Sequence, residues 1–258
     1  MSKSLPIRFV MVNTSQPGNI GAMARAMKNM CLSELYLVNP KGFPDETGHA
    51  RARSSGARDL LETAVIVDSL EDAIKDCVLV VGASARLRSI PWPVVTPREM
   101  GEQVVAEAHA APVAIVFGNE TNGLSNEELE QCNALVHIPA NAEYSSLNIA
   151  AAGQILAYEV YLAAEQGQFV DKDSLYDEQA PANTDELNGM YEHFEVALTE
   201  IGFLDPKAPR LLMRRLRRLF NRARPDRMEV NILRGILSAA QGNKAHRRPD
   251  RKDEKLKN

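Results

Sequence analysis

The feature that most constrains the fold is an apolar run that ends in a polar, glycine-rich loop, a pattern found twice within about thirty residues. Residues 112–117 (Pro-Val-Ala-Ile-Val-Phe) predict a buried strand, and Gly118–Leu124 follow at once. After a short helix pattern, a second predicted strand at 135–138 leads to Tyr144–Ala150, which opens another helix. In an open α/β sheet, ligands bind where strands end and helices begin. The two loops therefore predict a single pocket.

The rest of the first part of the chain alternates strand and helix patterns. Several strand patterns are apolar throughout, which is typical of a parallel sheet covered on both faces. Helix patterns lie between them, at 19–30 and at 69–74, where Ser69 is a predicted N-cap followed by acidic residues. Strands separated by helices predict βαβ units and an α/β fold. The further strands are expected at 7–12, 35–38, 64–67 and 78–81.

Composition excludes some classes of protein. The chain has 258 residues, 45% hydrophobic and 25% charged, which is ordinary for one large or two smaller globular domains. We expect no membrane span, because no apolar run approaches eighteen residues. The N-terminus has no signal-peptide pattern, so a cytoplasmic location is expected. Five histidines without ligand spacing predict no metal site. Three scattered cysteines, Cys31, Cys77 and Cys132, predict reduced, buried thiols.

The net charge of −4 hides an asymmetry between an acidic body and a basic C-terminal segment. Residues 210–258 contain sixteen Lys or Arg and five Asp or Glu, a net charge of +11. Residues 1–209 therefore carry about −15. This distribution favours a polyanionic partner that is contacted mainly by the C-terminal segment.

The second part of the chain is predicted to be helical. The body ends with a helix at about 147–164, and a helix from Thr184 to Ile201 is expected, with Thr184 as its cap. Leu211–Arg224 forms the clearest amphipathic pattern, and a helix near 229–240 would cover its apolar face. The predicted organisation is a body at 1–165, a polar linker at 166–185, a basic helical extension at 186–242 and a disordered tail at 243–258.

The amphipathic pattern at 211–224 separates two kinds of side chain. Its apolar face would contain Leu212, Leu216, Leu219, Phe220 and Ala223. Six arginines with no interleaved acid occupy the other face, whereas solvated helices usually mix charges of both signs. Arginine also suits bidentate phosphate contacts, so RNA or DNA binding is favoured over a merely solvated face. The predicted nucleic-acid ligands are Arg214, Arg215, Arg217, Arg218, Arg222 and Arg224.

The first loop, Asn13–Gly21, leads into a helix that carries Asn19 and Arg25. A helix N-terminus suits a phosphate, and Arg25 could add a forked cation. The alternative is a plain turn with a solvated arginine. The loop lacks the G-x-G-x-x-G fingerprint, so a dinucleotide oxidoreductase is disfavoured.

The other two loops also allow structural explanations. Glu120 could be a lone carboxylate at a pocket mouth, next to a Gly118 that allows a ligand close to the backbone, or it could cap the next helix. Ser145 and Ser146 could be ordinary caps, which leaves Asn148, a poor helix former expected within the first turn, unexplained. No histidine accompanies the serines, so Ser-His-Asp hydrolysis has little support.

With these three motifs the chain resembles the SPOUT methyltransferases of the TrmH-like branch. The motif N-x-G-x-x-x-R is present as Asn19–Arg25, G-x-E-x-x-G-L as Gly118–Leu124, and the third motif as Tyr144–Ala150. Residues 81–86 and 90–93 and the basic extension also resemble this family, so the likeness covers nearly the whole chain. Cys31 is a small departure, because relatives more often have Gly there.

The resemblance implies an α/β parallel-sheet SPOUT domain with a C-terminal trefoil knot, plus a small basic α-helical C-terminal domain. It implies a homodimer whose active sites contain residues of both subunits, and 2′-O-methylation of ribose at nucleotide 32 of tRNA by S-adenosyl-L-methionine. The implied catalytic residues are Asn19, Arg25, Glu120, Ser146 and Asn148. The implied cofactor-binding residues are Ala83, Ser84, Ala85, Gly118, Ile138, Ser145, Ser146 and Leu147.

Three questions stay open at this stage. The proton acceptor could be Arg25, or a bound phosphate that Arg25 fixes, since a guanidinium rarely gives up its proton. The substrate could be ribosomal RNA instead of tRNA. The chain could also be a catalytically silent RNA-binding protein with the same fold, although its three motifs are intact.

Overall fold

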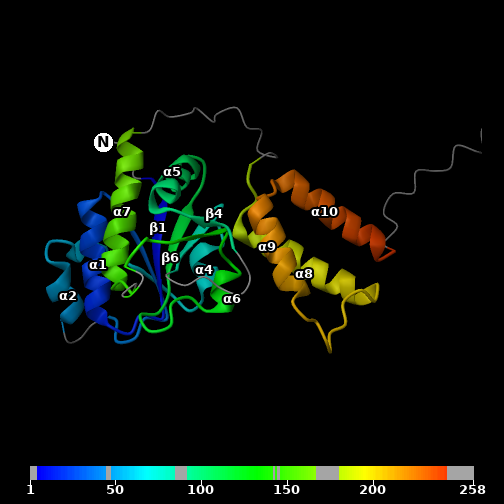
Figure 1. Ribbon diagram of the computed structural model, residues 1–258, viewed down its shortest axis with the longest axis horizontal. Coiled ribbons are helices and arrows are strands. Elements are labelled where there is room, and N and C mark those ends of the chain that lie inside the picture. Colours follow the sequence, from blue (N-terminus) through cyan, green and yellow to red (C-terminus); the bar gives the residue numbers. More distant parts are fainter. Residues whose placement is uncertain are drawn as a thin grey trace, which may run out of the picture.

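The computed structural model describes residues 5–44, 48–84, 92–141, 143, 146–166 and 180–242. Within them, seven strands form one sheet in the order β3-β2-β1-β6-β4-β7-β5, and every neighbouring pair is parallel (Figure 1). The predicted parallel α/β sheet is therefore confirmed. The knot implied by the resemblance involves the C-terminal loops of this domain, of which residues 144–145 lie outside the described residues.

The centre of the sheet consists of β1 (Ile7–Val12), β6 (Val113–Phe117) and β4 (Leu79–Ala83), followed by β7 (Ala134–Val136). Their apolar side chains are buried on both faces, as expected of a covered parallel sheet. The outer strands are β2 (Glu34–Val38), β3 (Val65–Val67) and the unpredicted β5 (Val94–Val95). Burial on both faces fails at β3, the strand at one edge of the sheet, where Val65 and Ile66 are 41% and 46% exposed.

Helices cover both faces of the sheet (Figure 1). One core lies under α1 (Pro17–Asn29), α5 (Pro97–Ala108) and α7 (Ile149–Gln166). The other lies under α4 (Leu70–Ile74), which Ser69 caps as predicted, and α6 (Asn126–Leu129). Two short helices, α2 (His49–Ser54) and α3 (Arg58–Glu62), pack on the outside of α1.

The first helix illustrates why the sequence folds in this way. It begins with a proline at its first position and buries Ile20, Met23, Ala24 and Met27, the i, i+3, i+4, i+7 spacing of one helical face. Cys31 follows with a left-handed φ of 58°. Cys31 is exposed, so the prediction of three buried thiols is wrong at this position, because the chain has already left the core. Cys77 and Cys132 are buried, and all three thiols are free.

Three C-terminal helices form a lobe beside the α/β body: α8 (Thr184–Glu200), α9 (Leu212–Ala223) and α10 (Arg227–Ala240) (Figure 1). Their small core contains Leu187, Met190, Tyr191 and Val230. Residues 167–179 of the predicted linker and the predicted tail at 243–258 lie outside the described residues.

Two local predictions for this lobe are wrong. Asn183, and not Thr184, caps α8, because its side chain accepts a hydrogen bond from the Glu186 amide. The predicted apolar face of α9 is only partly covered. Leu219 is 45% exposed and Ala223 is also exposed, because α10 packs mainly on α8.

Buried polar contacts attach the lobe to the body. Asn221 of α9 is only 4% exposed and donates to the carbonyl oxygens of Glu130 (3.0 Å) and Cys132 (3.1 Å). It also accepts a hydrogen bond from the Tyr191 hydroxyl at 2.7 Å. Leaving a buried carbonyl without a donor is costly, so these contacts fix α9 against the chain that follows α6.

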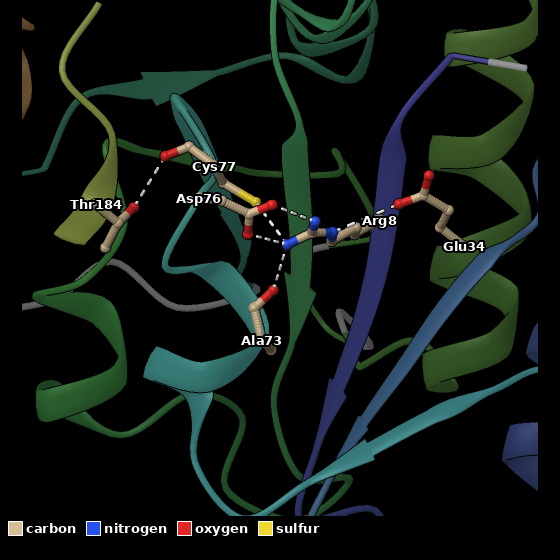
Figure 2. Close-up of polar contacts among 6 residues, drawn as sticks. All are labelled: Arg8, Glu34, Ala73, Asp76, Cys77 and Thr184. Carbon is tan, nitrogen blue, oxygen red and sulfur yellow. Dashed lines mark hydrogen bonds and ion pairs between the residues drawn. The ribbon is translucent and has the colours of Figure 1, made fainter.

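A second attachment lies at the amino ends of the strands, next to a buried ion cluster (Figure 2). Arg8 of β1 bonds both carboxylate oxygens of Asp76, at 2.5 and 2.6 Å, and the carbonyl oxygen of Ala73 at 3.0 Å. The guanidinium of Arg8 holds the pKa of Asp76 below its usual value, and burial raises the pKa of the Cys77 thiol to about 12. The Thr184 hydroxyl and backbone amide both donate to the Cys77 carbonyl oxygen at 3.1 Å, so α8 begins on this cluster.

Candidate active site

A cavity of about 450 Å³ lies at the opposite end of the sheet, where β1, β4, β6 and β7 run into their loops. This is the carboxyl end of the strands, where open α/β sheets bind ligands. Both loops singled out in the sequence contribute to its wall, as predicted. Its lining includes Asn19, Ser84, Gly118, Glu120, Ile138, Ser146 and Asn148.

Glu120 is the centre of a hydrogen-bond network at one wall of this cavity. Its Oε2 accepts from the Ser15 amide and hydroxyl, both at 3.0 Å, and its Oε1 accepts from the Gln16 amide at 3.2 Å and from Asn19 Nδ2 at 3.0 Å. Glu120 therefore joins the loop after β6 to the segment that begins α1. It is not a helix cap. Ser125 caps α6 instead.

The same contacts set the charge of Glu120. Partial burial alone would raise its pKa, but the hydrogen bonds from the Ser15 backbone and the Asn19 side chain outweigh it and keep the pKa below its usual value. A carboxylate that accepts this many donors stays ionised at neutral pH. Glu120 is therefore suited to hold the two loops in place, and poorly suited to take up a proton.

Asn148 continues the network on the far side of Asn19. Its Nδ2 donates to Asn19 Oδ1 at 3.0 Å, and its Oδ1 accepts from the amides of Ala150 (2.9 Å) and Ala151 (3.3 Å). The expectation that Asn148 lies within the helix is wrong. It precedes α7 and caps it, the role for which Asn is well suited. Asn19, Glu120 and Asn148 thus form one chain of contacts.

Glycine is required at position 118 for a different reason from the one predicted. A Cβ at Gly118 would lie 2.2 Å from backbone atoms of Gly123 and Leu124, and Asn119 pairs with Gly123 in an isolated bridge. The loop folds back on its own backbone, and this close approach requires glycine whether or not a ligand is present. Gly118 still lines the cavity.

Most of the expected cofactor-binding residues meet at this cavity. Ala83, Ser84, Gly118, Ile138, Ser146 and Leu147 all line it, whereas Ala85 and Ser145 lie outside the described residues. The sequence reasoning missed Ser15 and Gln16, which bond Glu120, and Thr121 and Asn122 of the cavity wall. Ser15 and Gln16 were detectable only as polar residues in the first loop.

Arg25 is the one expected catalytic residue that the described cavity does not include. It is exposed on α1, six residues after Asn19. Six residues correspond to about 9 Å of helix rise and a rotation of roughly 120° from Asn19. Within one chain, Arg25 therefore faces away from the network that Asn19 joins.

The predicted arginine face of α9 divides into two groups. Arg214 forms an ion pair with Glu130, and Arg224 pairs with Glu107 at 3.3 Å, so both hold the lobe against the body. Arg217 lies 4.5 Å from the centre of the Tyr191 ring and donates to Asn188 at 3.1 Å. Arg218 also has contacts within the chain, whereas Arg215 and Arg222 are exposed.

Two further findings concern the described part of the chain. No group of three or more His, Cys, Asp or Glu side chains there could hold a metal ion. Among the helices with described residues, none combines the length and apolar character that crossing a membrane requires.

The comparisons with known proteins agree with this fold. Residues 6–158 match the model of the SpoU rRNA Methylase family, and residues 185–253 match that of the C-terminal domain of tRNA methyltransferase TrmJ. The chain therefore belongs to the SpoU rRNA Methylase family.

Individual relatives are similar over almost the whole length. The chain is 51% identical over 243 residues to a TrmJ of Pseudomonas aeruginosa named as a tRNA (cytidine/uridine/adenosine-2'-O-)-methyltransferase, covering 91% of this chain and 93% of that protein. It is also 51% identical to the tRNA (cytidine/uridine-2'-O-)-methyltransferase TrmJ of Pectobacterium atrosepticum, with coverage of 91% and 96%. The crystal structure of TrmJ from Z. mobilis ZM4 aligns with a TM-score of 0.75 at 32% identity, covering 90% and 97%.

Proposed function

We propose that this protein transfers a methyl group from S-adenosyl-L-methionine to the ribose 2′-hydroxyl of cytidine or uridine at nucleotide 32 of tRNA. The main observation that supports this proposal is the Asn19–Glu120–Asn148 network on the wall of a cavity at the carboxyl end of the sheet. The similarity to TrmJ proteins across both parts of the chain supports tRNA as the substrate. The proposal implies a cytoplasmic protein.

The residues present fit the proposed cofactor. The cavity volume of about 450 Å³ lies within the range of small-molecule sites, and its wall combines apolar and polar groups, as such sites do. Gly118, Ile138 and Leu147 would hold the adenosine part, together with Ala83, Ser84, Ser146 and, by resemblance, Ala85 and Ser145. When bound, the cofactor supplies an activated methyl group.

The chain's own residues would align the ribose and protect the site from water. Glu120 holds the Ser15–Asn19 segment, so it is a positioning residue for Asn19. Asn19 and Asn148 fix each other, and Ser146 lies on the same cavity wall. Alignment of this kind accounts for a large share of the rate of a transfer reaction.

Arg25 would act in the active site of a second subunit. It is exposed on α1, which packs against α7, and Ile155 and Tyr158 of α7 are 36% and 47% exposed. Exposed apolar side chains on a helix whose other face is buried suit a self-complementary interface. In a homodimer of this kind, Arg25 would fix a phosphate of the RNA beside the partner's cavity, and that phosphate could accept the hydroxyl proton.

Mixed dimers test this arrangement. Arg25→Ala and Glu120→Ala homodimers should both lose turnover while still folding. A mixed dimer of the two variants would contain one site with both residues intact, so we expect roughly half of the wild-type turnover per dimer. Mixed dimers as inactive as the parents would show that Arg25 acts within its own chain. A molar mass of one chain, measured by light scattering, would show that the protein is a monomer and would overturn the dimer.

The reaction itself is tested by mapping. The full chain would be incubated with unmodified tRNA transcripts, ribosomal RNA and radiolabelled S-adenosyl-L-methionine, and the modified nucleotide would be located by nuclease digestion and mass spectrometry. We expect label at the ribose of nucleotide 32 in tRNA. Label only in ribosomal RNA would change the substrate, and cofactor binding without any transfer would favour a silent RNA-binding protein.

A further inference from the structure

Three exposed, positively charged residues lie on the short helix α2 or in the loop before it, on a part of the body that no motif includes. We call Lys41, Arg51 and Arg53 the α2 patch. The short helix α2 is held tightly against α1, since a Cβ on Gly21 would lie 2.0 Å from the Ala50 carbonyl oxygen. Ala50 and Ser54 are the buried face of α2, so Arg51 and Arg53 lie on either side of that face.

Two contacts fix the patch next to the loop that holds Glu120. The Lys41 amide donates to the Thr14 carbonyl oxygen at 2.9 Å, one residue before Ser15. On the other side, Cγ of Arg53 is 3.5 Å from the position that a Cβ on Gly18 would occupy, one residue before Asn19. The patch therefore flanks the segment from Ser15 to Asn19, which forms one lip of the cavity.

The charges of the α2 patch have no counterions among the described residues. Lys41, Arg51 and Arg53 are exposed, and the structure gives none of them an ion pair. Asp45 and Glu46 lie outside the described residues. Some other cations of the body are paired, Lys28 with Asp59 at 2.6 Å and Arg98 with Glu159 at 3.2 Å. Arg25, Arg58 and Lys75 are exposed single cations that, like the patch, have no ion pair among the described residues. What sets the α2 patch apart is that three unpaired cations lie together beside the Ser15–Asn19 segment, in a body (residues 1–165) whose net charge is −7, and an anionic ligand would explain such a group.

We propose that the α2 patch binds phosphates of the RNA strand on either side of the target ribose, as a second RNA-contacting surface separate from α9. The inference rests on the proposed function and adds the body's own contact with the substrate. Cations on both flanks of a helix suit successive phosphates of a strand better than one small anion. Arginine adds bidentate geometry at each contact.

The surface is tested on the full-length protein with an unmodified tRNA transcript. Arg51→Gln/Arg53→Gln would be compared with wild type and with Lys75→Gln, which removes an exposed cation from the end of α4 on the opposite face of the sheet. Lys75→Gln removes only one charge, so it is compared directly with the single variant Arg53→Gln. Dissociation constants would be measured from 50 to 200 mM salt, and single-turnover rates at saturating tRNA.

We expect the double variant to bind tRNA about tenfold more weakly at low salt, with the salt slope reduced by roughly 1 to 2. Cofactor binding and the saturated single-turnover rate should stay unchanged, and Arg51→Lys/Arg53→Lys should restore the slope, since charge carries the contact. Arg53→Gln should weaken tRNA binding more than Lys75→Gln does.

The outcomes separate this inference from the function on which it rests. A double variant with wild-type affinity and salt slope, in a preparation whose wild type methylates tRNA, overturns the α2 patch and leaves the proposed function intact. Equal losses in Arg53→Gln and Lys75→Gln also overturn it, because the effect would then be one of net charge. A wild-type protein that neither binds nor methylates tRNA overturns the proposed function first.

Discussion

The two ends of the sheet contain similar polar clusters with opposite consequences. At the amino end, Arg8 is buried among Asp76, Ala73 and Cys77, and every strong partner belongs to the chain itself (Figure 2). At the carboxyl end, Glu120 is held equally well by Ser15, Gln16 and Asn19, but that network faces a cavity of about 450 Å³. Both clusters contain a carboxyl group with a lowered pKa.

The difference shows that a shifted pKa alone does not identify a functional site. Structural ion pairs also perturb pKa values. What distinguishes Glu120 is open space beside the network, at the end of the strands where parallel sheets bind ligands. The Arg8 cluster instead joins β1, the turn after α4 and the start of α8, so we expect it to act on stability.

The largest effect is expected from Glu120→Ala. This change releases Ser15, Gln16 and Asn19, and misplacement of catalytic groups lowers rates steeply, so we expect turnover to fall on the order of 10³-fold. Thermal unfolding should change little, because Glu120 is only partly buried. Turnover within tenfold of wild type would remove Glu120 from the positioning role.

The reverse pattern is expected from Arg8→Met. Loss of the buried guanidinium removes the partner of Asp76, and we expect the free energy of unfolding to fall by about 3 kcal/mol. This value is at the lower end of the range for breaking a buried ion pair, because Asp76 is half-exposed. Turnover of the folded variant should stay within about twofold of wild type, since distant sites act independently. Urea unfolding and initial rates would check both, and a selective loss of turnover would contradict the comparison.

The same pair predicts a pH dependence. The pKa of Asp76 is lowered in the folded state, so its stabilising contribution is present above the unfolded value of about 4 and is lost as pH falls through the folded value. The difference in unfolding free energy between wild type and Arg8→Met should therefore be full at pH 7 and shrink below about pH 4. A difference that stays constant down to pH 3 would show that packing, not charge, dominates.

A smaller effect is expected at the seam between lobe and body. Asn221→Ala leaves the carbonyls of Glu130 and Cys132 and the Tyr191 hydroxyl without this partner, and we expect a loss of about 2 kcal/mol. Amide exchange should accelerate in α9 before the central strands. Unchanged protection in α9 would mean that the ion pairs of Arg214 and Arg224 suffice.

The smallest effect is expected from Arg215→Gln/Arg222→Gln on the exposed part of α9. Each arginine that binds a phosphate contributes about 1 to the salt slope, so the double variant should lose about 2, and tRNA affinity should fall about fivefold without loss of stability. Arg214→Gln/Arg224→Gln is the control that removes the same number of charges, since these arginines pair with Glu130 and Glu107, and it should affect stability more than the salt slope. A larger loss of salt slope in the control would show that the paired arginines bind the RNA instead.

Much of the site was predictable from local sequence. The residues that were not predicted correctly depend on contacts or boundaries that the local sequence does not determine. The loops that contain Asn19, Glu120 and Asn148 could be found because each follows a predicted strand. The partners Ser15 and Gln16 could not be found, because no pattern indicates which backbone amides a carboxylate will contact when they lie more than a hundred residues earlier, 105 in the case of Ser15. Asn148 was misjudged because a one-residue difference in the start of α7 separates an interior position from a cap.

The sequence by itself determined the parallel strands, the order of the motifs and the strongly amphipathic character of α9, because these depend on the spacing of neighbouring residues. Only the tertiary structure decided which charges are free. The six arginines of α9 have no acid beside them in sequence, yet Arg214 and Arg224 find Glu130 and Glu107 across the seam, while Arg51 and Arg53 of α2 find no described counterion. Ion pairing acts through space, so residues distant in the chain determine whether an arginine can meet a ligand.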